Sequence, residues 1–182
     1  VGSAPFITTA PKGAEFQDQY RPRDASVYAL RLALLAKRYP NINAWQVWNE
    51  QNLPNNWRPQ VNAEEYARLL LASHQALNIA APDKIQVMGG MAYYSQMPHF
   101  GGDLMFQSLI NQGQLHPDVV AAYHPYTNNP EGEDVAARDF VVHGSQLNSL
   151  LRSKGVKNIW ATEFGWSSYA GPVEMQPIIG EA

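Results

Sequence analysis

The stretch Ile42-Asn43-Ala44-Trp45-Gln46-Val47-Trp48-Asn49-Glu50 decides the fold. Its apolar and β-branched residues are typical of a strand buried in a parallel sheet. The run stops abruptly on an amide beside a carboxylate, Asn49 and Glu50. We therefore predict a buried strand whose C-terminal tip carries chemically active side chains.

Strand-like runs alternate with helix-like runs around this stretch. Such alternation predicts parallel strands joined by right-handed crossovers, with the functional loops after the strands. We expect the strands to pair in chain order. The predicted strands lie near residues 1–7, 42–49, 85–90, 119–123 and 158–163, and the predicted helices near 24–39, 62–81, 103–112 and 135–153.

Two of these helices have clear start signals and apolar faces. Asp24 and Asn62 are predicted N-caps, because their side chains can accept hydrogen bonds from the first turn. The expected core faces are Val27, Leu30, Leu34 and Leu35 on the first helix, and Tyr66, Leu69, Leu70, Ser73 and Leu77 on the second.

Two architectures fit this alternation, an open doubly wound sheet and a barrel. No G-x-G-x-x-G turn or P-loop follows a strand, and we interpret Gly89-Gly90 as a tight bend, so the barrel is favoured. A complete (β/α)8 barrel needs about 250 residues, whereas this chain has 182. The predicted fold class is therefore α/β, a partial (β/α)8 TIM barrel with parallel strands, in which residues 1–182 form one incomplete domain.

Composition narrows the function classes. The net charge of −3 leaves no basic footprint for nucleic acid, and no apolar run is long enough to span a membrane. The absence of cysteine excludes thiolate metal sites and a cysteine nucleophile. We expect no metal and no cofactor, since His74, His99, His116 and His143 lack ligand spacing and are interpreted as surface or capping residues.

Glu50 and Glu163 both follow a predicted strand. A curved parallel sheet would direct both side chains into one cleft at the C-terminal ends of its strands, with carboxyl groups roughly 4 to 7 Å apart. Paired carboxylates at that separation are the apparatus of retaining glycoside hydrolysis. Asn49 and Glu50 would face opposite sides of a regular strand, so we also expect the strand to end or bulge there.

Three motifs carry a resemblance to a known group of enzymes. Trp48-Asn49-Glu50-Gln51-Asn52-Leu53 resembles the "WNEPN" signature after the fourth strand of clan A glycoside hydrolases, with Gln51 where many relatives carry Pro. Thr162-Glu163-Phe164-Gly165-Trp166 resembles their seventh-strand nucleophile motif, and His124-Pro125-Tyr126 resembles the H-x-Y of their sixth strand. The loop at residues 52–57 is similar to families 39 and 5. Together the motifs would cover strands three to seven.

The resemblance implies a retaining glycoside hydrolase that cleaves O-glycosidic bonds of a polysaccharide or oligosaccharide by double displacement. Glu50 would be the acid/base and Glu163 the nucleophile. Tyr126 would donate to Glu163, and Asn49 would bind the sugar 2-OH. His124 is expected either to line the site or to be a buried structural histidine. The resemblance also suggests a secreted or periplasmic protein.

Aromatic residues divide into two expected groups. Trp57 and Trp166 lie on the loops after predicted strands and are expected to stack on sugar rings. A position facing the cleft is an alternative for Tyr93 and Tyr94 that the sequence does not favour. Trp45 and Trp160 lie within predicted strands and are expected in the core.

Two other functions stay open at this point. One is a sugar-binding but catalytically silent barrel fragment, and the other is an unrelated α/β enzyme for small molecules. In either barrel interpretation the outermost strands would be open edges, so the fragment is also expected to associate with itself.

Overall fold

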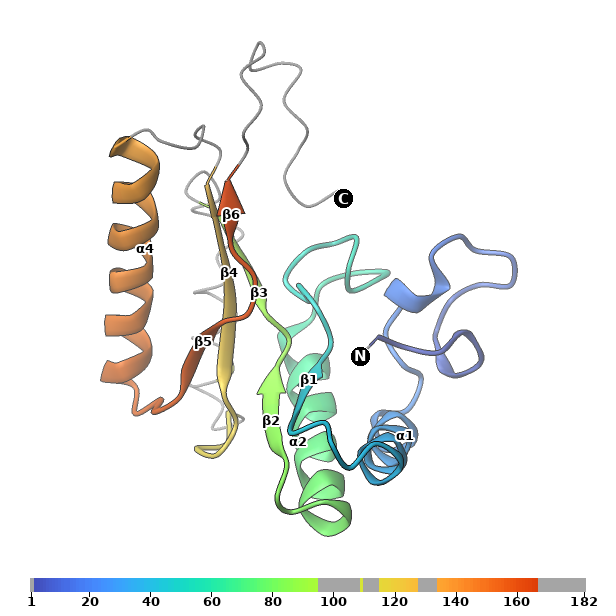
Figure 1. The fold of residues 1–182 in the computed structure, drawn as a ribbon. Helices are drawn as coiled ribbons and strands as arrows, with labels where there is room; N and C mark the ends of the chain where they lie inside the picture. The colour runs from blue at the N-terminus through green and yellow to red at the C-terminus, as the bar shows by residue number, and fades with distance from the viewer. Residues whose placement is uncertain (1, 95–108, 110–114, 128–133, 167–182) are drawn as a thin grey trace.

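The computed structural model describes residues 2–94, 109, 115–127 and 134–166 of the chain. Within these residues the protein is a mixed α/β structure with parallel strands in two small sheets (Figure 1). In one sheet β1 pairs with β2, and in the other β4 pairs with β3, β5 and β6. The strands are β1 (Ala44–Val47), β2 (Ile85–Met88), β3 (Met91–Tyr94), β4 (Ala121–Thr127), β5 (Ile159–Ala161) and β6 (Gly165–Trp166).

The two sheets are neighbours in space. A parallel bridge between Val87 of β2 and Val120, just before β4, connects them. The order β1, β2/β3, β4, β5 follows the chain, as the alternation predicts for residues 42–163. Among the described residues the strands do not close into a barrel.

Helices cover these strands on two sides (Figure 1). α1 (Ala25–Arg38) and α2 (Ala63–Ala80) pack against each other beside β1 and β2, whereas α4 (Asp134–Ser153) lies beside β4 and β5. Both predicted N-caps are confirmed. Asp24 accepts a 2.7 Å hydrogen bond from the backbone N–H of Ser26, and Asn62 accepts a 3.0 Å one from that of Glu65.

The expected core face is right for α2 and wrong for α1. The five residues predicted on α2 are all buried. On α1 the residues that are buried are instead Tyr28, Ala29, Leu32, Ala33 and Ala36. The predicted stripe, Val27, Leu30, Leu34 and Leu35, is 37–62% exposed. This helix has two apolar stripes, and the one with small alanines allows close packing on α2, which periodicity alone does not reveal.

Three further expectations need correction or fall outside the description. Residues 2–7 contain no strand; Pro5–Ile7 form the 3-10 helix η1, whose start suits a proline that lacks an N–H. Trp160 is 40% exposed and not in the core, because β5 is an edge strand in the described chain, whereas Trp45 is buried as predicted. The helix expected near 103–112 lies outside the described residues, except for the buried Leu109.

A buried tyrosine joins α2 to the ends of β1 and β2. Tyr66 donates a 2.9 Å hydrogen bond to the carbonyl of Val47 and accepts a 2.7 Å hydrogen bond from the N–H of Gly89. Burial raises the pKa of this phenol above its ordinary range, so it stays protonated and can donate. The β1–β2 pairing ends at Val47 and Met88, and Tyr66 satisfies the backbone carbonyl of Val47 and the N–H of Gly89, the residue after β2.

Replacing Tyr66 by Phe should lower the free energy of unfolding by about 1–3 kcal/mol, because two buried backbone groups lose their partner. Urea unfolding followed by circular dichroism measures the change. Tyr39→Phe is the matched control, since Tyr39 is half exposed, and it should change stability by less than about 0.5 kcal/mol. Equal stability of the two variants would contradict the role of Tyr66.

Candidate active site

β1 ends in a distorted turn that redirects Glu50 inward. Trp48 and Glu50 have positive φ angles, 77° and 47°, a left-handed conformation that is rare outside glycine. The backbone N–H of Glu50 then donates a 2.9 Å hydrogen bond to the carbonyl of Gly90. As a result Glu50 is only 5% exposed while Asn49 is exposed. The prediction that this strand ends or bulges at Asn49 and Glu50 is confirmed, because β1 ends at Val47.

Beyond the end of β1, the side chains of Gln51 and Asn52 form the hydrogen bonds to the neighbouring chain segment that a longer strand would form with its backbone. The Asn52 amide donates to the carbonyl of Ala92 and accepts from its N–H, both at 2.9 Å. The Gln51 amide donates to the carbonyl of Gly89 at 2.9 Å. Both side chains are buried. The turn that carries Glu50 is therefore fixed to Gly89, between β2 and β3, and to Ala92 of β3, a contribution that sequence reasoning missed.

His124, from β4, lies between the two glutamates. Its ring is fully buried, with Nδ1 3.0 Å from Glu50 Oε1 and Nε2 3.1 Å from Thr162 Oγ1. Nε2 also lies 3.5 Å from Glu163 Oε1. In the neutral ring Nδ1–H donates to Glu50 and Nε2 accepts from the Thr162 hydroxyl; in the protonated ring both nitrogens donate. The two expectations for His124, lining the site and being a buried structural histidine, both apply.

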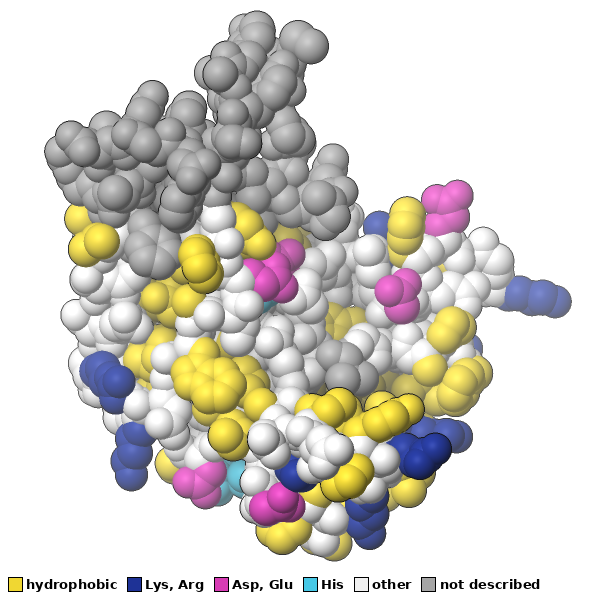
Figure 2. Space-filling view, in the orientation of Figure 1, with side chains coloured by type: hydrophobic (Ala, Val, Ile, Leu, Met, Phe, Trp, Pro, Cys, Tyr) yellow, Lys and Arg dark blue, Asp and Glu magenta, His cyan; other side chains and the backbone are white. Residues whose placement is uncertain are grey.

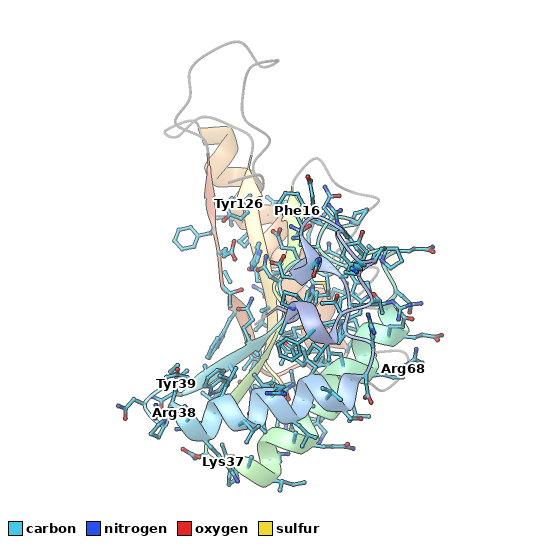
Figure 3. The ribbon with its side chains drawn as sticks, turned by 90° about the vertical axis from the view of Figure 1, so that its right-hand side faces the viewer. Phe16, Lys37, Arg38, Tyr39, Arg68 and Tyr126 are labelled. Carbon is cyan, nitrogen blue, oxygen red and sulfur yellow. The ribbon has the colours of Figure 1, made fainter. Side chains whose placement is uncertain are left out.

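Glu163 follows β5 and is held from β4. The Tyr126 hydroxyl donates a 3.1 Å hydrogen bond to Glu163 Oε2, which is the contact expected of this pair. Burial, followed by the negative charge of Glu163, raises the pKa of Tyr126, so the phenol remains a donor at neutral pH. Figure 3 shows Tyr126 far from Lys37 and Arg38 of α1 and from Tyr39, which follows α1. Tyr126 lies near the C-terminal end of β4.

The two carboxylates meet at this end. One oxygen of Glu50, one of Glu163 and one ring nitrogen of His124 all lie within 4.8 Å of one another. This upper limit on the distance between the nearest oxygens is compatible with the separation of roughly 4 to 7 Å predicted for the two carboxyl groups. The two glutamates differ in environment, since Glu50 is buried and the Glu163 side chain is 44% exposed.

Asn56 is a further site residue that sequence reasoning missed. Its amide donates a 3.1 Å hydrogen bond to Glu50 Oε2, the carboxylate oxygen that does not face His124. The indole N–H of Trp48 donates to the backbone carbonyl of Asn56 and so holds that loop residue in place. Both oxygens of Glu50 therefore have a partner. The only available signal was the position of Asn56 six residues after Glu50 in a polar loop.

The two tryptophans expected to stack on sugars are not both at the surface. Trp57 is 1% exposed and packs edge-on against Trp48 and Tyr66, at centroid distances of 5.0 and 5.6 Å. The expected stacking role of Trp57 is therefore wrong, because both faces of its ring are covered by the core. The backbone of Trp166 lies in β6, but its side chain, like those of Tyr93 and Tyr94, lies outside the described part of the chain.

The residues Glu50, His124 and Glu163 are also of types that ligate metals. In the present arrangement the buried His124 already contacts both glutamates and Thr162, and Asn56 and Tyr126 contact the other carboxylate oxygens. The arrangement is a closed hydrogen-bond network around two carboxylates. Two carboxylates held in this way are able to transfer protons or to act as nucleophiles.

Comparisons with known proteins do not add to this geometry. No protein-family model matches the sequence, and no curated protein matches it. Within the described residues, no helix has the length and apolarity needed to cross a membrane.

Gly90 leaves the space that His124 occupies. A Cβ at Gly90 would lie 1.9 Å from His124 Nε2, and one at Gly89 would lie 2.9 Å from the carbonyl of Val47. Neither glycine has a positive φ, so the backbone does not need glycine for a tight bend. Glycine is needed because His124 and the carbonyl of Val47 lie too close for a side chain at these positions.

The Gly90→Ala variant should displace His124 and lower the free energy of unfolding by about 1–3 kcal/mol, because the added methyl group would overlap the buried imidazole ring. Urea unfolding measures the loss, and a crystal structure of the variant shows the histidine. Gly144→Ala is the control: its Cβ would meet only the Tyr123 hydroxyl, at 3.4 Å, inside α4. Unchanged stability in Gly90→Ala would contradict the close approach.

Proposed function

We propose that this protein is a retaining glycoside hydrolase that cleaves O-glycosidic bonds of a polysaccharide or oligosaccharide. The observation that carries the proposal is the meeting of Glu50 and Glu163, with oxygens within 4.8 Å at the C-terminal ends of parallel strands. Carboxyl groups of retaining enzymes are about 5–5.5 Å apart, whereas inverting enzymes leave about 6.5–9.5 Å for a water molecule. The geometry favours attack by a carboxylate on the sugar.

The environments of the two glutamates suggest their roles. Glu163 is the more exposed and is oriented by Tyr126, which suits the nucleophile that attacks the anomeric carbon. Glu50 is buried and oriented by His124 and Asn56, and the proposal assigns to it the proton transfer to the leaving oxygen. In the second step Glu50 takes a proton from water, and this water releases the sugar from Glu163.

The same proposal gives Asn49 and the fold a function. Asn49 is exposed beside Glu50 and would bind the sugar 2-OH, a contact that strengthens as charge develops at the anomeric carbon. The parallel strands β1 to β5 would be a segment of a (β/α)8 barrel. The open order of the strands and the exposed apolar stripe of α1 support this interpretation, because further barrel units would cover both.

Kinetics of glutamine variants test the assigned roles in the full-length protein. Glu163→Gln should reduce turnover to background on every substrate, because no carboxylate is left to attack. Glu50→Gln should retain the first step on dinitrophenyl glycosides, whose leaving group needs no proton, and lose about 10²–10⁴-fold on methyl glycosides. Initial rates and the product anomer, followed by proton NMR, measure these effects. Glu64→Gln, in the exposed first turn of α2, is the control.

The outcomes separate the candidate functions. Equal losses in Glu50→Gln on both substrate types would contradict the acid/base role, and an inverted product would contradict the retaining mechanism. Saturable binding of oligosaccharides without turnover in the wild-type protein would favour the catalytically silent sugar-binding alternative.

The apolar stripe of α1 leads to a proposal about association. A groove of about 500 Å3 runs between η1 and this stripe and is lined by Phe6, Ile7, Leu34 and Leu35, among others. We propose that in the 182-residue chain a second copy covers this face, which apolar exposure of this kind favours.

The double variant Leu30→Lys, Leu34→Lys should therefore weaken self-association, because two residues that are 62% and 60% exposed become charged. Sedimentation velocity over a range of concentrations measures the oligomer fraction. Ile79→Lys, at an 86% exposed position of α2 outside the stripe, should leave it unchanged. Identical association of both variants would contradict the proposal.

A further inference from the structure

A second group of ligating side chains lies at the other end of the strands. It consists of His74 on α2 and of His116 and Asp118 in the segment before β4. One ligand atom of each lies within 4.8 Å of the others. The two imidazole rings are neighbours, with centroids 4.1 Å apart. The expectation of a surface or capping residue is therefore wrong for His74, which is buried, and right for His116, which is 42% exposed and accepts a hydrogen bond from the backbone N–H of Asp118.

His74 is held in one tautomer by its neighbours. The amide nitrogen of Gln86 donates a 3.0 Å hydrogen bond to the carbonyl of Leu70, which turns Gln86 Oε1 toward His74. This oxygen lies 3.0 Å from His74 Nδ1, so Nδ1 carries the proton and Nε2 carries the lone pair. Metal-binding histidines are oriented in the same way, by donating their other N–H to an oxygen.

The lone pair of His74 faces a group that a cation can replace. The Asn78 amide, one helical turn further along α2, lies 2.9 Å from His74 Nε2. A rotation of the Asn78 amide breaks its hydrogen bond to His74 Nε2. The same rotation turns the Asn78 oxygen toward the position that a cation bound to Nε2 would take.

The other two side chains are partly or largely exposed, which leaves them room to rotate. His116 Nδ1 accepts a 3.3 Å hydrogen bond from the backbone N–H of Asp118, so its lone pair lies on the side of that residue. The Asp118 carboxylate is 3.6 Å from the same nitrogen, and the two side chains are 42% and 80% exposed. Ligands of tetrahedral zinc are about 3.4 Å apart for bonds near 2.1 Å. A rotation of the exposed His116 ring and a contraction of about 1 Å would bring the three together.

We propose that His74, His116 and Asp118 form a binding site for a divalent transition metal ion of the zinc type. Two imidazoles and one carboxylate are the ligand set that zinc accepts with a fourth position open, whereas magnesium and calcium prefer oxygen ligands alone. The ion would connect α2 to the segment that leads into β4. It would lie at the opposite end of the strands from Glu50 and Glu163. The proposal therefore does not depend on the proposed hydrolase activity.

Calorimetric titration of the chelator-treated protein with zinc sulfate at pH 7.5 tests the site. We expect binding of one ion per chain and a rise in the thermal unfolding midpoint when zinc is in excess, because the ion binds the folded state only. His116→Ala and Asp118→Ala should each weaken binding at least about 10-fold. These two positions are at the surface, so their variants should fold. Asp83→Asn, an exposed acid paired with Lys84 just before β2, should bind like the wild type.

The Glu163→Gln variant shows whether the measured zinc binding comes from the cluster of Glu50, His124 and Glu163 instead. Glu163→Gln should bind zinc with unchanged affinity, because Glu163 belongs to the other end of the strands. Loss of binding in Glu163→Gln with retention in His116→Ala would overturn the proposal. So would the absence of a stoichiometric binding event, or equal affinity of the wild type and both the His116→Ala and Asp118→Ala variants.

Discussion

The left-handed backbone of Trp48 and Glu50 is the constraint on which the site depends. A regular strand would place Asn49 and Glu50 on opposite faces and keep the carboxylate away from β4. The two positive φ angles turn the chain so that Glu50 becomes buried while Asn49 remains exposed. Such a conformation costs free energy at non-glycine residues. The hydrogen bonds of Gln51 and of the Glu50 backbone to Gly89 and Gly90, and that of Asn52 to Ala92 in β3, offset that cost.

His124 extends this constraint to the second sheet. The ring reaches Glu50 on one side and Thr162 and Glu163 on the other, so it connects the ends of β1, β4 and β5. It fits there because Gly90 has no side chain. Packing and chemistry are therefore coupled, since the space that lets the strands approach also aligns the two carboxylates.

The two ends of the parallel strands carry different groups of side chains. The C-terminal ends carry the glutamates, where α/β barrels keep their reactive groups, and the opposite end of such folds generally serves stability. The group formed by His74, His116 and Asp118 lies at that second end and joins a helix to the start of a strand. In Figure 2 histidine and acidic side chains lie together at the lower edge of the face in view, away from the grey upper part. A cation there would connect α2 to the segment before β4 and would not contact Glu50 or Glu163.

Sequence alone determined the parallel α/β order of residues 42–163, the two helix caps and the pair of glutamates. These features follow from short-range patterns, because caps, periodicity and strand ends are encoded within a few residues. The tertiary structure decided which stripe of α1 is buried, that Trp57 belongs to the core, and that Asn56 and Thr162 contact the site. It also brought His74 to His116, which no spacing indicates. Those outcomes depend on contacts between segments far apart in the chain, and their geometry exists only once the strands and helices have packed.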